Sequence, residues 1–126
     1  MESVCERVPI KLVSINVITK RGYYDCEVVS CKDKEHDSRP LLVYFFRVIK
    51  GKCEGFQVSA GFYYKEMKGR ARLSHLCKAV DVTGHLDDPK DIIGKKLCLR
   101  VVPRMTEHNG KTYRNHHITR FHALGK

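Results

Sequence analysis

The sequence lacks the long apolar stretches that membrane insertion and secretion require. None of its apolar runs approaches the ~18–20 residues that a helix needs to cross a bilayer, and residues 1–7 contain no apolar stretch like that of a signal peptide. We therefore expect a protein that neither spans a membrane nor is secreted, with a cytoplasmic location. The 126 residues suit a single domain, with residues 1–20 as an arm or extra strand and residues 21–126 as the domain itself.

Signatures of catalysis are also missing. The sequence contains no P-loop, no Gly-x-Ser-x-Gly, no dinucleotide-binding fingerprint and no His-Glu-x-x-His. Its carboxylates are scattered, whereas a nuclease would need them clustered around metal. The adjacent pair Asp87 and Asp88 precedes Pro89, so helix capping explains it better than acid catalysis does. We expect neither an enzyme nor a protein with a cofactor.

The six cysteines include no Cys-x-x-Cys pair, and outside a secreted protein we expect reduced thiols. Cys26 and Cys31 are five residues apart, which predicts opposite faces if one strand holds both. Cys77 and Cys98 are predicted on core faces. These spacings make a structural metal site improbable.

The seven histidines do not predict a metal site either. His116 and His117 are adjacent, so on a strand they point to opposite faces. His116 and His122 would share a face but lie about 20 Å apart at ~3.3 Å per residue. Histidines at the surface or in contact with phosphate are the better interpretation.

Acidic residues are scarce and unevenly placed. The chain has 24 Lys and Arg against 14 Asp and Glu, a formal net charge of +10. Residues 1–63 carry ten basic and eight acidic side chains, whereas residues 64–126 carry fourteen and six. From Lys95 onward there are eight basic residues and one acid, Glu107. Such a one-sided positive field favours a polyanionic partner, most often nucleic acid.

Apolar residues alternate along five segments, and one further segment has helical spacing. The predicted strands are residues 23–31, 41–49, 55–63, 96–102 and 112–121, with a polar loop over 32–39. Leu73, Leu76, Cys77 and Val80 form the apolar stripe of a helix. Pro103 is expected to end the fourth strand, and Asn109-Gly110 predicts a hairpin turn.

Three strands, a helix and two further strands form the arrangement of an OB-fold, a five-stranded antiparallel barrel. We therefore predict a mainly β protein of this class, with one helix between strands three and four. A five-stranded sheet packed on one helix in another topology is the alternative. Residues 8–18 alternate weakly, so they could add a strand or form an arm.

Aromatic residues on the outer face of this barrel predict a stacking platform. If Leu42, Tyr44, Phe46 and Val48 face the interior, the second strand presents Leu41, Val43, Phe45 and Arg47 outward. Tyr23 and Tyr63 would share that surface. Nucleobases stack on such rings, and Arg47 would add charge. For Phe45, cover by the N-terminal arm or a dimer interface is an equally good explanation.

Basic residues complete the predicted site. Lys68, Arg70 and Arg72 open the helix, Lys111 and Arg114 lie at the second hairpin, and Arg100, Arg104 and Arg120 lie along its strands. Each alone is better explained as a solvated charge. Together they predict a phosphate track.

Residues 39–122 resemble a family of bacteriophage OB-fold single-stranded DNA-binding proteins. The segments that carry the resemblance are PLLVYFFRVIKG (40–51), ARLSHLCKAV (71–80), DIIGK (91–95) and NGKTY (109–113), with Arg120 and Phe121. The outer face of the second strand is more apolar here than in that family. The resemblance implies an OB-fold that binds single-stranded DNA in replication or recombination, without catalysis, in the host cytoplasm if a phage encodes it.

We therefore expect a single-stranded DNA-binding module with little sequence preference. Tyr23, Phe45 and Tyr63 would stack bases, and the predicted phosphate contacts are Arg47, Arg70, Arg72, Arg100, Lys111 and Arg114. RNA is the alternative ligand, because OB-folds bind both polymers. A small basic adaptor or inhibitor that docks on an acidic protein surface is the alternative from another class. The sequence leaves the oligomeric state open, a homodimer included.

Overall fold

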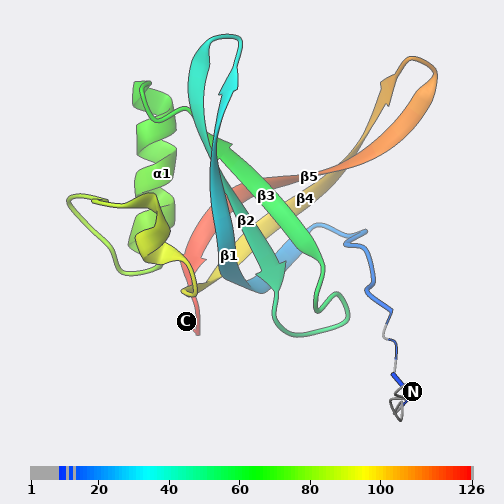
Figure 1. Cartoon of the computed structure of the whole chain (residues 1–126). Helices are drawn as coiled ribbons and strands as arrows, with labels where there is room; N and C mark the ends of the chain where they lie inside the picture. The colour runs from blue at the N-terminus through cyan, green and yellow to red at the C-terminus, as the bar shows by residue number, and fades with distance from the viewer. Residues whose placement is uncertain (1–8, 11, 13, 126) are drawn as a thin grey trace, which may run out of the picture.

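The computed structural model describes residues 9–10, 12 and 14–125, which form one sheet and one α-helix (Figure 1). The elements are β1 (Gly22–His36), β2 (Arg39–Val48), β3 (Gln57–Phe62), α1 (Met67–Ala79), the 3₁₀ turn η1 (Pro89–Ile92), β4 (Lys96–His108) and β5 (Lys111–Ala123). The prediction of a mainly β chain with a helix between the third and fourth strands is confirmed.

All five strands belong to one antiparallel sheet in the order β3-β2-β1-β4-β5. Its two edges are therefore β3 and β5. The hydrogen-bonded ladder does not continue from one of these edges to the other, so the sheet is not closed. The strong twist of the sheet nevertheless brings β3 and β5 near each other on one side of the molecule (Figure 1).

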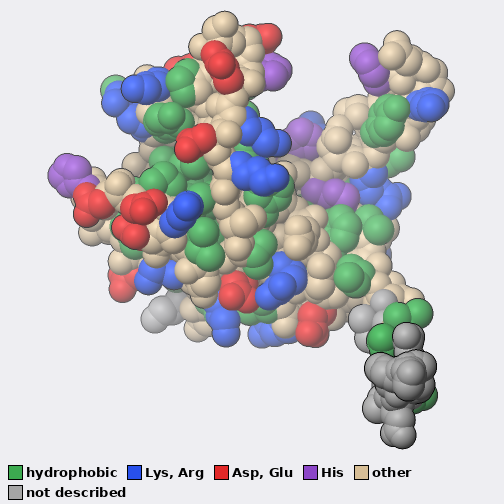
Figure 2. Space-filling view, viewed as in Figure 1, with side chains coloured by type: hydrophobic (Ala, Val, Ile, Leu, Met, Phe, Trp, Pro, Cys, Tyr) green, Lys and Arg blue, Asp and Glu red, His purple; other side chains and the backbone are tan. Residues whose placement is uncertain are grey.

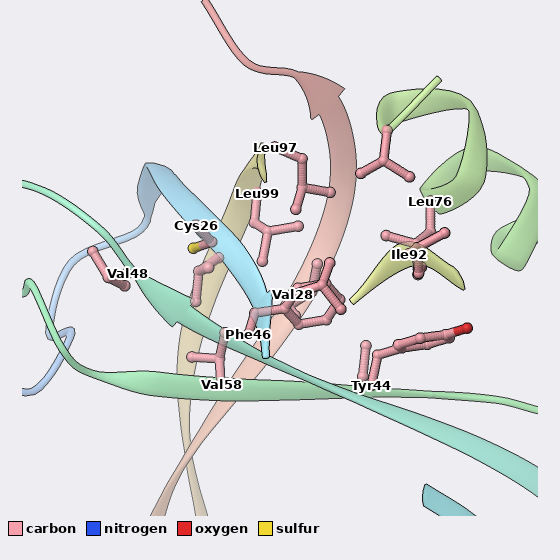
Figure 3. Packing of buried hydrophobic residues seen from close by; sticks show 14 of the residues in the cluster. Cys26, Val28, Tyr44, Phe46, Val48, Val58, Leu76, Ile92, Leu97 and Leu99 are labelled. Carbon is pink, nitrogen blue, oxygen red and sulfur yellow. The ribbon is translucent and has the colours of Figure 1, made fainter. Parts of the chain in front are cut away.

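The core lies inside this curved sheet (Figure 3). Leu42, Tyr44, Phe46 and Val48 all face inward, as the alternation along the second strand predicted. They pack with Leu97, Leu99, Leu76 and Ile92, which are fully buried. The Tyr44 hydroxyl donates to the Pro89 carbonyl oxygen at 2.6 Å, and burial raises the pKa of this phenol. The end of the sheet under α1 and η1 is therefore covered without leaving that hydroxyl unpaired.

The helix α1 and the 3₁₀ turn η1 form where the sequence predicts the apolar stripe and the Asp-Pro cap. Leu76, Cys77 and Val80 are buried, in agreement with the predicted stripe. Asp88 caps η1, since its Oδ1 accepts from the Lys90 amide at 2.9 Å. The start of α1 passes so close to the end of β3 that a Cβ at Gly69 would lie 2.0 Å from the Tyr63 carbonyl oxygen. Glycine is required there.

Both long hairpins extend further than the sequence predicted. The supposed loop 32–39 is paired strand up to His36 and Arg39, and Asp37 and Ser38 form the turn with φ of 52° and 62°. Pro103 does not end β4. The strand runs on to His108, because pairing with β1 stops at Val101 and the free edge tolerates a residue without an N–H.

A bulge in β1 corrects the prediction for two cysteines. The pairing with β2 shifts between Val28 and Ser30, so one extra residue restores the inward face at Cys31. Cys26 and Cys31 therefore both lie against the core, and the prediction of opposite faces is wrong. Cys98 was also placed wrongly, since its neighbours Leu97 and Leu99 are the buried ones and it faces outward opposite Asp25.

The described part of the N-terminal segment forms no strand, although part of the range predicted for one lies outside the described residues. Ile18 is fully buried in the core, and its carbonyl oxygen lies 2.9 Å from His116 Nε2. Asn16 Nδ2 donates to the Lys52 carbonyl oxygen at 2.9 Å. The segment is thus anchored to the β2–β3 turn and to β5.

Candidate nucleic-acid interface

A groove of about 550 Å³ lies between the outer face of β2–β3 and the edge strand β5. Phe45, Gln57 and Ser59 line one side, and Arg114, Asn115 and His117 line the other. Beyond this groove the β1–β2 and β4–β5 hairpins project away from the sheet and from each other, with open space between them (Figures 1 and 2). An extended polymer can therefore enter the groove from the space between the hairpins.

Phe45 is half-buried at the centre of this surface. Its cross-strand neighbours are Ser30 on β1 and Ser59 on β3, whose small side chains leave part of the ring exposed. The Lys32 ammonium lies 5.9 Å from the ring centroid. An aromatic ring flanked by cations from two strands, Lys32 and Arg114, can stack a planar base and neutralise its phosphate.

Arg72 closes the lower end of the gap between β3 and β5. It is half-buried, and its two terminal nitrogens donate to the carbonyl oxygens of Gly61 on β3 and Ile118 on β5, at 2.8 and 2.7 Å. Its guanidinium carbon lies 4.9 and 5.6 Å from the ring centroids of Phe62 and Phe121. Arg72 was predicted to contact phosphate, but these nitrogens are already engaged, so its role is to join two strand edges.

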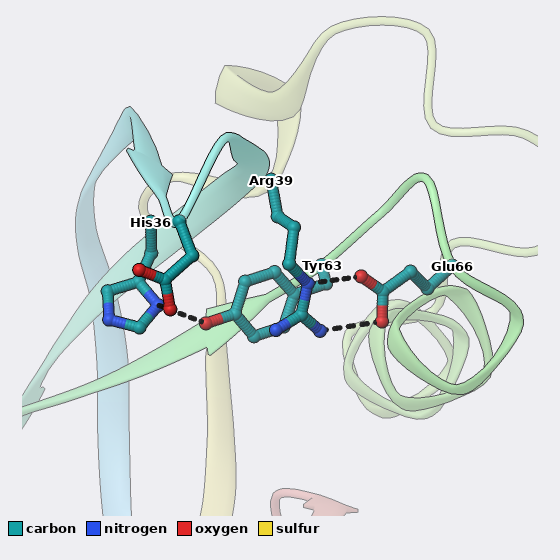
Figure 4. Close-up of polar contacts among 5 residues, drawn as sticks. His36, Arg39, Tyr63 and Glu66 are labelled. Carbon is teal, nitrogen blue, oxygen red and sulfur yellow. Dashed lines mark hydrogen bonds and ion pairs between the residues drawn. The ribbon is translucent and has the colours of Figure 1, made fainter.

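Tyr63 is also engaged within the protein (Figure 4). The Arg39 guanidinium lies 3.8 Å above the ring centroid, and the Tyr63 hydroxyl lies 3.2 Å from His36 Nδ1. Arg39 donates two hydrogen bonds to the Glu66 carboxylate, at 2.6 and 2.7 Å, and these lower the pKa of that carboxyl. One face of the ring is therefore occupied by Arg39 and is closed to the predicted stacking of a base.

Tyr23 does not share a surface with Phe45. The pairing of β1 with β2 begins at Cys26, so Tyr23 lies beyond the end of β2 and faces Arg100 of β4 instead. The Tyr23 ring is 58% exposed and lies 5.7 Å from the His122 ring. The predicted platform is thus divided along the outer face of the sheet, with Phe45 on β2 and Tyr23 beside Arg100 of β4.

The other predicted cations lie in three different places. Arg47 faces the same side as Phe45 and forms an ion pair with Glu27 at 3.3 Å. Arg70 is exposed on α1, beside a hollow between the helix and residues 82–86. Lys111 lies next to the tip of the β4–β5 hairpin, on the same strand as Arg114. Phe45 and Arg114 are the predicted ring and cation that the structure brings into one groove.

Sequence reasoning missed the other side of this groove. On the first side, Gln57 and Ser59 of β3 line the groove, as the alternation along the predicted strand 55–63 indicates. His117 was expected only at the surface or in contact with phosphate, and Asn115 had no signal, because the approach of β5 to β3 depends on the curvature of the whole sheet. The alternation of apolar and polar residues assigns a residue to one face of a strand, but it does not show which residues of a distant strand lie across a groove from it.

No protein-family model matches the sequence, and the curated proteins include none with detectable similarity. Within residues 9–10, 12 and 14–125, no group of three or more His, Cys, Asp or Glu has an arrangement that could hold a metal ion. None of the helices in the described part of the chain is long and apolar enough to cross a membrane. The geometry of the groove therefore carries the functional argument.

Proposed function

We propose that the protein binds single-stranded nucleic acid, with DNA as its ligand, in the groove between β3 and β5. The observation that carries the proposal is the half-buried ring of Phe45, which lines the same groove as Arg114. The strand order, with one helix after β3, is compatible with an OB-fold, a partly open barrel that binds oligonucleotides on the face of its second and third strands.

Two physical effects would provide the affinity. Stacking of one base on an aromatic ring contributes about 1–3 kcal/mol and does not depend on the base. Lys32 and Arg114 lie beside the groove, and Lys111 lies three residues before Arg114 on β5; all three would neutralise phosphates. A net charge of +10 raises the local concentration of any polyanion. Little sequence preference is expected, because stacking and charge contacts do not distinguish bases.

An unpaired strand fits this geometry better than a duplex. A ring at the floor of a groove can reach the face of a base only if that base is not stacked and paired within a helix. The protein would bind such strands during DNA replication or recombination, in keeping with the phage proteins that the sequence resembles. RNA remains the alternative ligand, since none of the groove residues selects against the 2′-hydroxyl.

A binding comparison at two ionic strengths tests this proposal. Fluorescence anisotropy with oligothymidylate, oligouridylate and a duplex of equal length should rank the single-stranded DNA first. The logarithm of its affinity should fall with the logarithm of salt concentration, at a slope of about −0.7 for each phosphate contacted. Equal affinity for the duplex would leave only charge attraction and contradict the stacking contact. Absence of binding to all three would favour the adaptor that docks on an acidic protein.

A further inference from the structure

The outer face of β4–β5 carries no acidic side chain. Leu97, Leu99 and Val101 are fully buried, so the alternate residues of β4 face outward, together with their partners on β5. The cations of this face are Arg100, Arg104, Lys111 and Arg120, with His117 and His122 among them. Glu107, the acid of the two strands, pairs with Thr112 on the opposite face. We call this surface the outer stripe.

A bulge keeps the outer stripe continuous. The pairing of β4 with β5 shifts between Arg100 and Val101, which leaves Thr119 as an extra residue on β5. Ile118 and Phe121 can both pack against the core because of this extra residue, and Arg120 and His122 then face outward. Without the bulge, strict alternation after His117 would point them inward. Arg100 Nη1 donates to the Thr119 hydroxyl at 3.0 Å and holds the bulge.

The stripe connects the groove to the exposed ring of Tyr23. His117 belongs to the stripe and also lines the groove beside Phe45. At the other end, Tyr23 lies opposite Arg100 and 5.7 Å from the His122 ring. The first acid beyond that end is Asp25, which forms an ion pair with Lys50 at 2.9 Å. The path from the groove to Tyr23 therefore contains no unpaired acidic side chain.

We infer that a single strand held at Phe45 continues along the outer stripe, with phosphates at Arg104, Arg100 and Arg120 and a base on Tyr23. This inference rests on the proposed function and extends its site. From Asn115 at the groove to His122 beside Tyr23, β5 spans about 23 Å at ~3.3 Å per residue, much longer than a contact at Phe45 alone. The binding site should therefore be longer than the ~4 nucleotides at the low end of the range that OB-folds cover.

The dependence of affinity on oligonucleotide length tests the inference. Oligothymidylates of about 4 to about 20 nucleotides span the expected range, and the wild-type affinity should rise until the path is filled. In R104A/R120A the rise should stop at a shorter length, and affinity for the longest strand should fall about tenfold. Both arginines are exposed, so the fold is retained. The salt slope for that strand should fall by about 1.4, which is ~0.7 for each lost contact.

A matched control separates this effect from net charge. Lys65 and Lys90 are exposed and lie in the β3–α1 turn and in η1, outside β4–β5, so K65A/K90A removes the same charge and should keep the wild-type length dependence. R104K/R120K should restore most of the affinity. If R104A/R120A stops gaining affinity at the same length as the wild type, the stripe is not part of the path. If the wild type binds no oligothymidylate at any length, the proposed function itself has failed.

Discussion

The two long hairpins both project from the sheet but differ in their chemistry. Residues 32–39 of the β1–β2 hairpin carry three basic and three acidic side chains, whereas residues 104–117 of the β4–β5 hairpin carry three basic side chains, one acid and three histidines. Figure 2 shows acidic side chains at the tip of the first hairpin and basic ones on the second. A hairpin that projects from the sheet therefore attracts a polyanion only if its side chains carry an excess of positive charge.

The hairpins also differ in what their charges contact. On the β1–β2 side, Arg39 is bound to Glu66 and stacked on Tyr63, and His36 lies 3.5 Å from Asp37. On the β4–β5 side, Lys111 and Arg114 are exposed and have no acid across the ladder. Internal pairing engages Arg39 of the first hairpin, whereas Lys111 and Arg114 of the second hairpin keep their charge available. We expect nucleic-acid binding to depend on the second hairpin.

Reversal of charge on each hairpin in turn is the strongest test of whether DNA affinity depends on the second hairpin more than on the first. K111E/R114E should weaken single-stranded DNA binding by about 100-fold and lower the salt slope by about 1.4. K34E/R39E changes the net charge equally but should weaken binding less than about fivefold, a loss of ~1 kcal/mol. Anisotropy titrations of both variants check this. Equal losses would mean that net charge alone controls affinity.

Removal of Arg72 tests a second difference between the two hairpins, which is how their strands are held in the sheet. Strand β1 lies inside the sheet with partners on both sides, whereas β5 is an edge strand whose free side is held by Arg72. R72A should lower the free energy of unfolding by about 2–3 kcal/mol, because hydrogen bonds from a charged donor are lost from two carbonyls. Urea denaturation followed by circular dichroism measures this, and R72K should recover part of the loss. Unchanged stability would show that Arg72 does not hold the edges together.

Truncation of Phe45 tests the ring between the two hairpins. F45A should weaken single-stranded DNA binding by about 1–3 kcal/mol, because one stacked base loses its platform. F45W should retain binding. The midpoint of urea unfolding should change little in F45A, because Phe45 lies outside the core cluster. A large loss of stability with unchanged affinity would instead assign Phe45 to packing or to an interface.

The smallest effect is expected at Glu66, on the side of the first hairpin. E66Q should leave DNA binding unchanged and should slightly lower the melting temperature at neutral pH. The hydrogen bonds from Arg39 lower the pKa of the Glu66 carboxyl in the folded state. Its contribution is therefore present above the unfolded pKa of ~4.3 and is lost as pH falls through the lower folded value. Melting curves of both proteins should converge at low pH, and a constant difference would contradict this account.

Local patterns predicted the elements and the core face of the sheet. The alternation of Leu42, Tyr44, Phe46 and Val48 placed the inward side of β2 correctly. The stripe of α1 and the Asn109-Gly110 turn were also found, because each depends on residues that are near in sequence. Closure of the sheet into a barrel was predicted but is not shown by the ladders.

The candidate site was less predictable, since it depends on what meets across the sheet. Arg72 and Tyr63 looked available in the sequence, but partners 11 to 46 residues away engage them. The bulge in β1 changed the face of Cys31, and nothing in the alternation marks an inserted residue. Pro103 was given too much weight, because the free edge that tolerates it exists only once the strands are assembled.

The two hairpins extend past the core, and this has a consequence for their mobility. Beyond Val101 and Ile118, the β4–β5 ladder has no buried residue on either face. Its amide protons are shielded only by the hydrogen bonds of the ladder, so they should exchange with deuterium far faster than those of Leu97 or Phe46. The segments that reach out for a ligand are thus those that open most readily, and they would become rigid only when it is bound.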